Sequence, residues 1–137
     1  MDPPLPEAPA STAGTPLPAA VVRHEGAPDG GHFDVLLAVR SPAGPDDPAC
    51  ATWRSAVDPA AAAAGEAIEL EPIAPHRALY LALDGPRTLD GGRGTVTPVR
   101  RGSWRREPDG AIGFLWSDGS ATRVVPESIN CWRRCAP

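Results

Sequence analysis

The sequence of 137 residues contains no lysine, no long apolar run and only three cysteines. All 13 basic residues are arginine, a bias to which we assign no mechanism. No apolar stretch approaches the roughly 20 residues that a membrane-spanning helix needs, so we expect no membrane partner. An odd number of cysteines without a secretory signal argues against a disulfide framework. Cys131 and Cys135 could form a local disulfide or half of a zinc site, but no second cysteine pair completes that site.

The first residues lack aromatic side chains and hydrophobic periodicity. Residues 1–20 include six prolines and five alanines, and they contain neither a basic n-region nor an unbroken apolar core. This composition excludes a signal peptide and predicts a disordered leader. We therefore predict a leader over residues 1–19, a single domain over 20–126 and a C-terminal tail over 127–137, in a cytoplasmic protein.

Positive charge is scarce overall but concentrated in one stretch. The chain carries a net charge of −4, whereas residues 87–106 hold six arginines and one acid, a net of +5, which leaves −9 for the rest. A basic band on an acidic protein is typical of one anionic partner bound at one place, here a nucleic-acid backbone. The alternative is a solvated, arginine-rich hairpin. The band consists of Arg87, Arg93, Arg100, Arg101, Arg105 and Arg106.

Short apolar alternations bounded by Gly, Pro and Asp recur along the chain. We predict eight short strands, over residues 19–24, 32–40, 49–54, 77–83, 94–99, 102–107, 111–116 and 120–125. This spacing indicates an all-β sandwich or small β-barrel. Pro98 interrupts one strand, which places it at an edge or a bulge. At most one short helix is expected, in DPAAAAAGEAIEL (58–70), where Asp58 is a candidate N-cap and Gly65 limits the helix to as little as a single turn.

The strand HFDVLLAVR (32–40) has an unusual polar face. Its odd positions are apolar and predict the buried side: Phe33, Val35, Leu37 and Val39. The opposite face begins with His32 and Asp34, about 7 Å apart at ~3.3 Å per residue. If the strand pairs with residues 19–24 as a hairpin, His24 lies beside that face. Two imidazoles and one carboxylate form a half-open coordination set for Mn²⁺, Fe²⁺ or Zn²⁺.

The segment APHRALYLALDG (74–85) carries a second polar group of residues. In a strand, its even positions from His76 to Asp84 share one face, and that face alternates polar with small side chains. Such a face leaves room for a ligand, and His76 and Tyr80 could donate hydrogen bonds to an anion held by the metal. The alternative is that His76 is an ordinary surface histidine and Tyr80 a core residue.

Several segments in order resemble a known family, the phosphoesterase domain of bacterial DNA ligase D and its free-standing relatives. These segments are His24, HFDVLL (32–37), TWR (52–54), HRALYLALDG (76–85), GGRGTV (91–96) and VRRGSW (99–104), and together they span roughly residues 20–116. The resemblance implies a small β-barrel enzyme with a catalytic divalent metal, usually Mn²⁺. Members of that family remove a terminal phosphate or ribonucleotide from DNA 3′ ends during repair.

By position, His24, His32 and Asp34 resemble the family's metal ligands, and His76 and Tyr80 resemble its catalytic groups that grip the scissile phosphate. Zn²⁺ and Fe²⁺ stay open as metals, and DNA and RNA both stay open as substrates. The implied partners are nucleic-acid 3′ ends and a separate ligase or polymerase acting in trans.

The sequence also departs from the family pattern. Leu36 stands where the family has a phosphate-clamping arginine, so we expect Arg40, Arg77 or Arg93 to replace it or the chemistry to be lost. Loss would leave a non-catalytic module that binds nucleic acid or phosphate. A third interpretation is an Fe²⁺ oxygenase, because the HxD pair with a distal histidine and a later arginine imitates that pattern.

Overall fold

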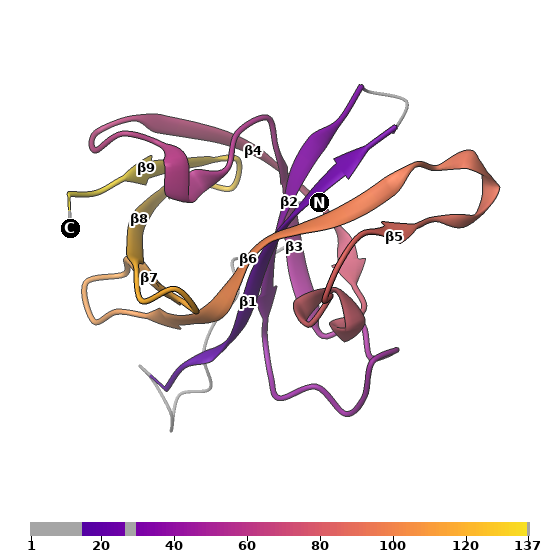
Figure 1. The fold of residues 1–137 in the computed structure, drawn as a ribbon. Coiled ribbons are helices and arrows are strands. Elements are labelled where there is room, and N and C mark those ends of the chain that lie inside the picture. The colour runs from indigo at the N-terminus through magenta and orange to yellow at the C-terminus, as the bar shows by residue number, and fades with distance from the viewer. Residues whose placement is uncertain (1–14, 27–29, 137) are drawn as a thin grey trace.

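The chain forms a closed antiparallel β-barrel of eight strands with one further strand outside it (Figure 1). The structure is a computed structural model that describes residues 15–26 and 30–136. The strands are β1 (Leu17–Glu25), β2 (His32–Ala38), β3 (Cys50–Ser55), β4 (Ala67–His76), β5 (Arg87–Thr88), β6 (Thr95–Arg106), β7 (Ile112–Trp116), β8 (Ala121–Ser128) and β9 (Cys131–Arg134). The predicted all-β small barrel is therefore confirmed. Among the described residues, no helix is both long and apolar enough to cross a bilayer.

The barrel closes through pairing between strands that are distant in the sequence. Its strand order is β1-β2-β3-β4-β9-β8-β7-β6, and β1 pairs with β6 to complete the circle. Strand β5 pairs with β6 outside the barrel. Strand β9 bridges β4 and β8, so residues 131–134 are part of the barrel, although we expected a tail there. Closure removes the exposed sheet edges at which strands aggregate.

The barrel interior is filled by large apolar side chains. Trp53, Trp104 and Trp132 are all buried to 1% exposure or less. The rings of Trp53 and Trp132 lie 5.2 Å apart, and the Trp104 indole donates a hydrogen bond of 2.9 Å to the Ala38 carbonyl. Three aromatic residues of this size account for much of the apolar burial in a small domain.

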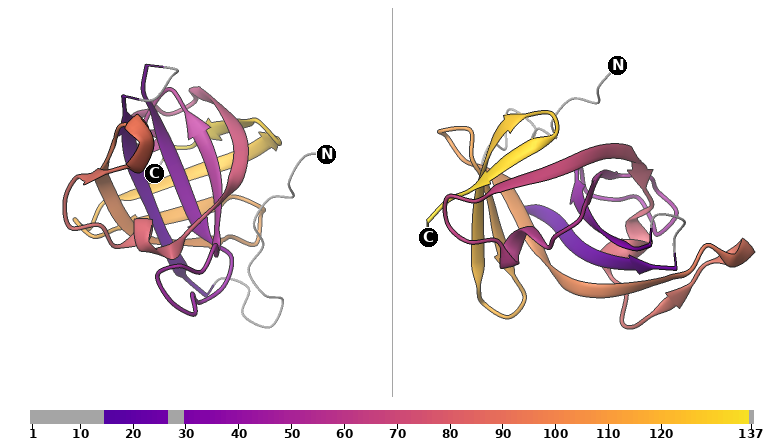
Figure 2. Two further views of the ribbon diagram at one scale, coloured as in Figure 1. Left: turned by 90° about the vertical axis from the view of Figure 1, so that its right-hand side faces the viewer. Right: turned by 90° about the horizontal axis from the view of Figure 1, so that it is seen from above.

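A second apolar cluster lies on the outer face of the barrel. Val22, Leu36, Cys50 and Val96 form it. Residues 77–94, which we call the cover segment, pack against it through Tyr80, Leu81, Leu83 and Leu89. Figure 2 shows the turns of this segment in front of the barrel strands. The outer face of β1 and β2 is therefore buried as well.

The predicted strand over residues 77–83 is wrong. Strand β4 ends at His76, and Ala78–Leu81 form a 3₁₀ turn, η3. The backbone N–H groups of Ala78 and Leu79 donate hydrogen bonds to the carbonyls of Asp47 and Pro45. These carbonyls belong to a loop, so the two N–H groups are not available to pair with a neighbouring strand. The tighter turn lets consecutive apolar residues of this segment face the outer cluster, which an alternating strand could not do.

The short helix expected within residues 58–70 is a single turn. Pro59–Ala61 form the 3₁₀ turn η2, capped by Asp58, whose carboxylate accepts a hydrogen bond of 3.0 Å from the Ala60 N–H. Strand β4 then begins at Ala67, and its buried residues Ile68 and Leu70 point into the barrel core. Burial of these two side chains outweighs the helix propensity of the preceding alanines.

The two strands predicted over residues 94–99 and 102–107 are one continuous strand, β6. Gly102 does not break it, because this glycine allows close contact with β7: a Cβ there would lie 2.0 Å from the Leu115 carbonyl oxygen. The β1–β6 register shifts at the pairing of Val22 with Pro98, so Pro98 lies at the predicted bulge. The expected leader over residues 1–19 ends early, since β1 begins at Leu17; residues 1–14 lie outside the described residues.

Candidate metal centre

The β1–β2 hairpin places two histidines directly opposite each other. His24 pairs with His32 in the register of this hairpin, and Asp34 follows two residues later on the same face. One ligand atom from each of the three lies within 4.8 Å of the others, and the two imidazole rings are 4.9 Å apart. His32 and Asp34 are each only 3% exposed. The three residues that the sequence singled out as ligands therefore converge.

The Asp34 carboxylate is the centre of this cluster. Its Oδ1 lies 3.2 Å from His32 Nε2, and its Oδ2 lies 3.6 Å from His76 Nε2. Oδ1 is buried yet accepts no hydrogen bond from the described residues. A buried carboxylate oxygen without a hydrogen bond is costly unless a cation satisfies it. The donor set of two imidazoles and one carboxylate fits a divalent transition metal.

His76 and Tyr80 lie beside the cluster, although they are not on one strand as predicted. His76 ends β4 and Tyr80 belongs to η3, and their rings are 5.7 Å apart. The His76 Nδ1 is 3.1 Å from the Ala74 carbonyl, which can only accept, so Nδ1 carries a hydrogen and Nε2 faces Asp34. The 3₁₀ turn thus keeps together the two groups that a regular strand was expected to align.

Leu36 occupies a position below the cover segment that solvent does not reach. It is fully buried in the outer cluster, against which Tyr80 packs. A guanidinium at this position would lie under an apolar layer, which explains why an aliphatic side chain fits here.

The arginines proposed to replace the missing clamp have local partners. Arg40 forms an ion pair with Asp47, and Arg93 Nε donates to the Asp90 carbonyl. Arg77 contacts Asp46 at 3.2 Å, and its guanidinium lies 5.9 Å from the centre of the Tyr80 ring. Tyr80 and then Asp46 raise the pKa of Arg77. Of the three, Arg77 is the one placed against a candidate catalytic residue.

Sequence reasoning missed Arg54. In the β2–β3 register Arg54 is directly opposite Asp34, so both side chains emerge on the outer face of the barrel. On its other side Arg54 pairs in register with Glu71 of β4. The signal was present in TWR (52–54), because Arg54 alternates with the inward-facing Trp53, but only the strand pairing brings it beside Asp34.

The basic band does not form one patch. Strand β6 has 12 residues, and at ~3.3 Å per residue it separates the two ends of the band. Arg87 and Arg93 belong to the β5–β6 hairpin near His24, whereas Arg105 and Arg106 lie at the far end of β6. Between them, Arg100 donates two hydrogen bonds to one oxygen of the buried Asp58, which commits it to a structural role.

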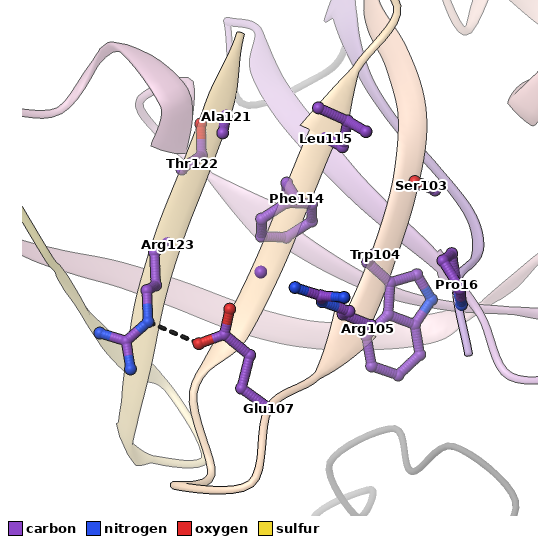
Figure 3. Close-up of a pocket in the computed structure, with 11 residues that line it drawn as sticks. Pro16, Ser103, Trp104, Arg105, Glu107, Phe114, Leu115, Ala121, Thr122 and Arg123 are labelled. Carbon is purple, nitrogen blue, oxygen red and sulfur yellow. Dashed lines mark hydrogen bonds and ion pairs between the residues drawn. The ribbon is translucent and has the colours of Figure 1, made fainter. Parts of the chain in front are cut away.

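A groove lies on a different part of the barrel, over β6, β7 and β8 (Figure 3). Its volume is about 370 Å³, and its lining is mostly apolar, with Phe114 and the exposed Leu115 among its residues. Glu107 and Arg123 form an ion pair of 2.6 Å at its wall. None of its lining residues belongs to the His/Asp cluster, and Arg105 is the one member of the basic band that lines it.

The cysteines add no second metal site. Burial, and after it the charge of Asp47, raises the pKa of the Cys50 thiol to about 11, so this side chain is neutral at physiological pH and a poor ligand. Among the described residues, the only group of three or more His, Cys, Asp or Glu side chains arranged to hold a metal is His24, His32 and Asp34.

No protein-family model, curated protein or solved structure matches the chain.

Proposed function

We propose that this protein is a cytoplasmic, divalent-metal-dependent phosphoesterase that removes a terminal phosphate or ribonucleotide from nucleic-acid 3′ ends, like the phosphoesterase domain of DNA ligase D. The observation that carries this proposal is the convergence of the half-buried His24 with the buried His32 and Asp34, with His76 facing the same carboxylate. The buried Asp34 Oδ1 accepts no hydrogen bond from the described residues and has only His32 Nε2, itself a candidate ligand, at 3.2 Å.

Each residue has a role in this reaction. His24, His32 and Asp34 hold the ion, for which we propose Mn²⁺, with Zn²⁺ and Fe²⁺ as the other ions that suit these ligands. A bound divalent ion supplies Lewis-acid stabilisation of the phosphoester and an activated water. The Tyr80 hydroxyl donates a hydrogen bond to a non-bridging oxygen of the phosphate as charge develops there. His76 does the same from Nε2 in its imidazolium form, because its Nδ1–H is already donated to the Ala74 carbonyl.

Two sources of positive charge flank this arrangement. Arg54 lies opposite Asp34 on the same face, and Arg87 and Arg93 lie on the hairpin beside His24. We propose that Arg54 contributes the charge that Leu36 does not, and that the hairpin arginines contact the nucleic-acid backbone. Arg105 and Arg106, at the other end of β6, then bind only a substrate that extends along the strand. A separate ligase or polymerase would use the trimmed end.

The test is phosphate release from a primer–template that bears a 3′-phosphate, with and without Mn²⁺. We expect release by the wild type only with metal, and a loss of roughly 100-fold or more in His32→Ala. A 5′-phosphate substrate and the surface variant Leu115→Ala serve as controls. Metal-independent release, or release that His32→Ala retains, would contradict the assignment. A primer ending in a ribonucleotide tests the second substrate.

One observation favours a second candidate, a binding module without catalysis. Leu36 is fully buried, so the family's phosphate clamp has no room at that position. This candidate predicts that the wild type binds both Mn²⁺ and 3′-phosphorylated DNA but releases no phosphate. If neither release nor DNA binding occurs, oxygen uptake with Fe²⁺ and 2-oxoglutarate tests the oxygenase interpretation.

A further inference from the structure

The β5–β6 hairpin turn, residues Asp90–Gly94, contacts the one candidate ligand that lies on β1. We infer that this turn positions His24 for metal binding through the main-chain carbonyl of Arg93, and that Gly94 is the residue that makes the contact possible. The inference rests on the proposed metal centre and assigns to the turn a positioning role, separate from any contact of its arginine side chains with substrate.

The first step concerns the protonation of His24. Its Nε2 lies 2.6 Å from the Arg93 carbonyl oxygen. Because a carbonyl can only accept, Nε2 carries the hydrogen, and in the neutral ring Nδ1 then bears the lone pair that a cation needs. A main-chain carbonyl bound to the distal N–H of a metal-binding histidine fixes its tautomer and ring orientation. The Arg93 side chain takes no part in this, since its Nε donates to the Asp90 carbonyl.

The second step concerns how the turn reaches β1. Thr95 pairs with Glu25 at the end of the β1–β6 ladder, and Leu89 N–H donates to the Gly94 carbonyl at 2.8 Å to close the turn. Gly94 has a φ of +93°, and a Cβ on it would lie 2.0 Å from the Glu25 carbonyl oxygen. That atom is main chain and cannot rotate away. Any side chain at position 94 therefore pushes the turn, and with it the Arg93 carbonyl, away from His24.

The same turn contains a matched control. Gly92 also has a positive φ, +69°, but a Cβ there would meet nothing within 4 Å. Gly92→Ala therefore imposes a similar backbone strain without separating the turn from β1. Arg93→Ala is a second control, because it removes the guanidinium but keeps the carbonyl.

The experiment measures Mn²⁺ affinity by titration calorimetry for the wild type, Gly94→Ala, Gly92→Ala and Arg93→Ala. We expect Gly94→Ala to weaken binding about 10- to 100-fold, while the two controls stay within about twofold. Urea unfolding without metal checks that each variant is folded. The ring ¹⁵N shifts of His24 in the metal-free proteins report its tautomer, and we expect Nε2–H in the wild type and a mixture in Gly94→Ala.

The outcomes separate this inference from the proposed function. A folded Gly94→Ala that binds Mn²⁺ as tightly as the wild type overturns the positioning role and leaves the metal centre intact. A wild type that binds none of Mn²⁺, Zn²⁺ and Fe²⁺ overturns both. If Gly94→Ala does not fold, the wild-type spectrum alone decides: a hydrogen on Nδ1 of His24 in place of Nε2 contradicts the inference.

Discussion

The two faces of strand β2 are both buried, and they differ in what buries them. Val35 and Leu37 point into the barrel, where they belong to the core that contains Trp53. His32, Asp34 and Leu36 point outward and are also buried, and residues 77–94 pack against the cluster that contains Leu36. The inner face packs apolar side chains against other apolar side chains, whereas the outer face holds a carboxylate oxygen without a hydrogen bond. Burial of the inner face stabilises the fold, and the outer face carries buried polar groups that a bound cation can satisfy.

The largest effect is expected from the inner face. Trp53→Ala should lower the free energy of unfolding by about 3–5 kcal/mol, because it removes a fully buried ring that packs on Trp132. Urea denaturation measures it. Leu115→Ala, at a side chain that is 57% exposed, is the control and should change stability by less than about 0.5 kcal/mol. Equal losses in the two variants would mean that the barrel interior is loosely packed.

A charge placed below the cover segment should have the next largest effect. We expect Leu36→Arg to cost about 2–4 kcal/mol, because it loses buried apolar area and brings a guanidinium into the outer cluster. Leu36→Met, which nearly conserves volume, should cost less than about 1.5 kcal/mol. The measurement is the urea midpoint of both variants. Wild-type stability for Leu36→Arg, together with faster phosphate release, would mean that the cover segment makes room for a clamp.

Metal binding at the outer face should stabilise the folded protein. At a Mn²⁺ concentration of 100 times Kd, the free energy of unfolding of the wild type should rise by about 2.7 kcal/mol and fall back when the metal is chelated. Asp34→Asn should lose this gain, yet be at least as stable as the wild type without metal, because it replaces a buried carboxylate with a neutral amide. Asp46→Asn, at a carboxylate that is 84% exposed, should keep the gain. A metal-induced increase that survives in Asp34→Asn would locate the ion elsewhere.

The sequence predicted the hairpin and its site better than it predicted the cover segment. Alternation over residues 32–40 follows from local pattern, and pairing across a short connection places His24 opposite His32 without knowledge of the rest of the fold. The turn at Ala78–Leu81 could not be read in this way. Its backbone bonds go to Pro45 and Asp47, more than 30 residues earlier, so an apolar run there imitates a strand.

Strand β9 and the position of Arg54 were missed for a related reason. Residues 131–134 are too few to show a period, and they become a strand because β4 and β8 lie on either side of them. Arg54 is an unremarkable residue in TWR, and it gains its proposed role only from the β2–β3 register. Features set by long-range pairing therefore need the structure, whereas those set within one hairpin do not.

The smallest expected effect is a pH dependence of the free energy of unfolding, which reports how well water is excluded from the outer cluster. Cys50 belongs to the outer cluster, and burial raises the pKa of its thiol from 9.0 to about 11. Below pH 9 both the folded and unfolded states keep the proton, so the thiol adds no pH dependence. Above pH 9 the unfolded chain loses its proton first, and at pH 10 the free energy of unfolding should be lower by about 1.4 kcal/mol.

Cys50→Ala removes this titration and leaves Cys131 and Cys135 unchanged, so the two proteins should differ in stability by an amount that grows between pH 8 and pH 10. Urea unfolding at both pH values measures the difference. Parallel curves would mean that the Cys50 thiolate reaches water in the folded protein. The cover segment would then open readily, and the cost assigned to a charge at Leu36 would have to be lowered as well, because both effects depend on the same layer of Tyr80, Leu81, Leu83 and Leu89.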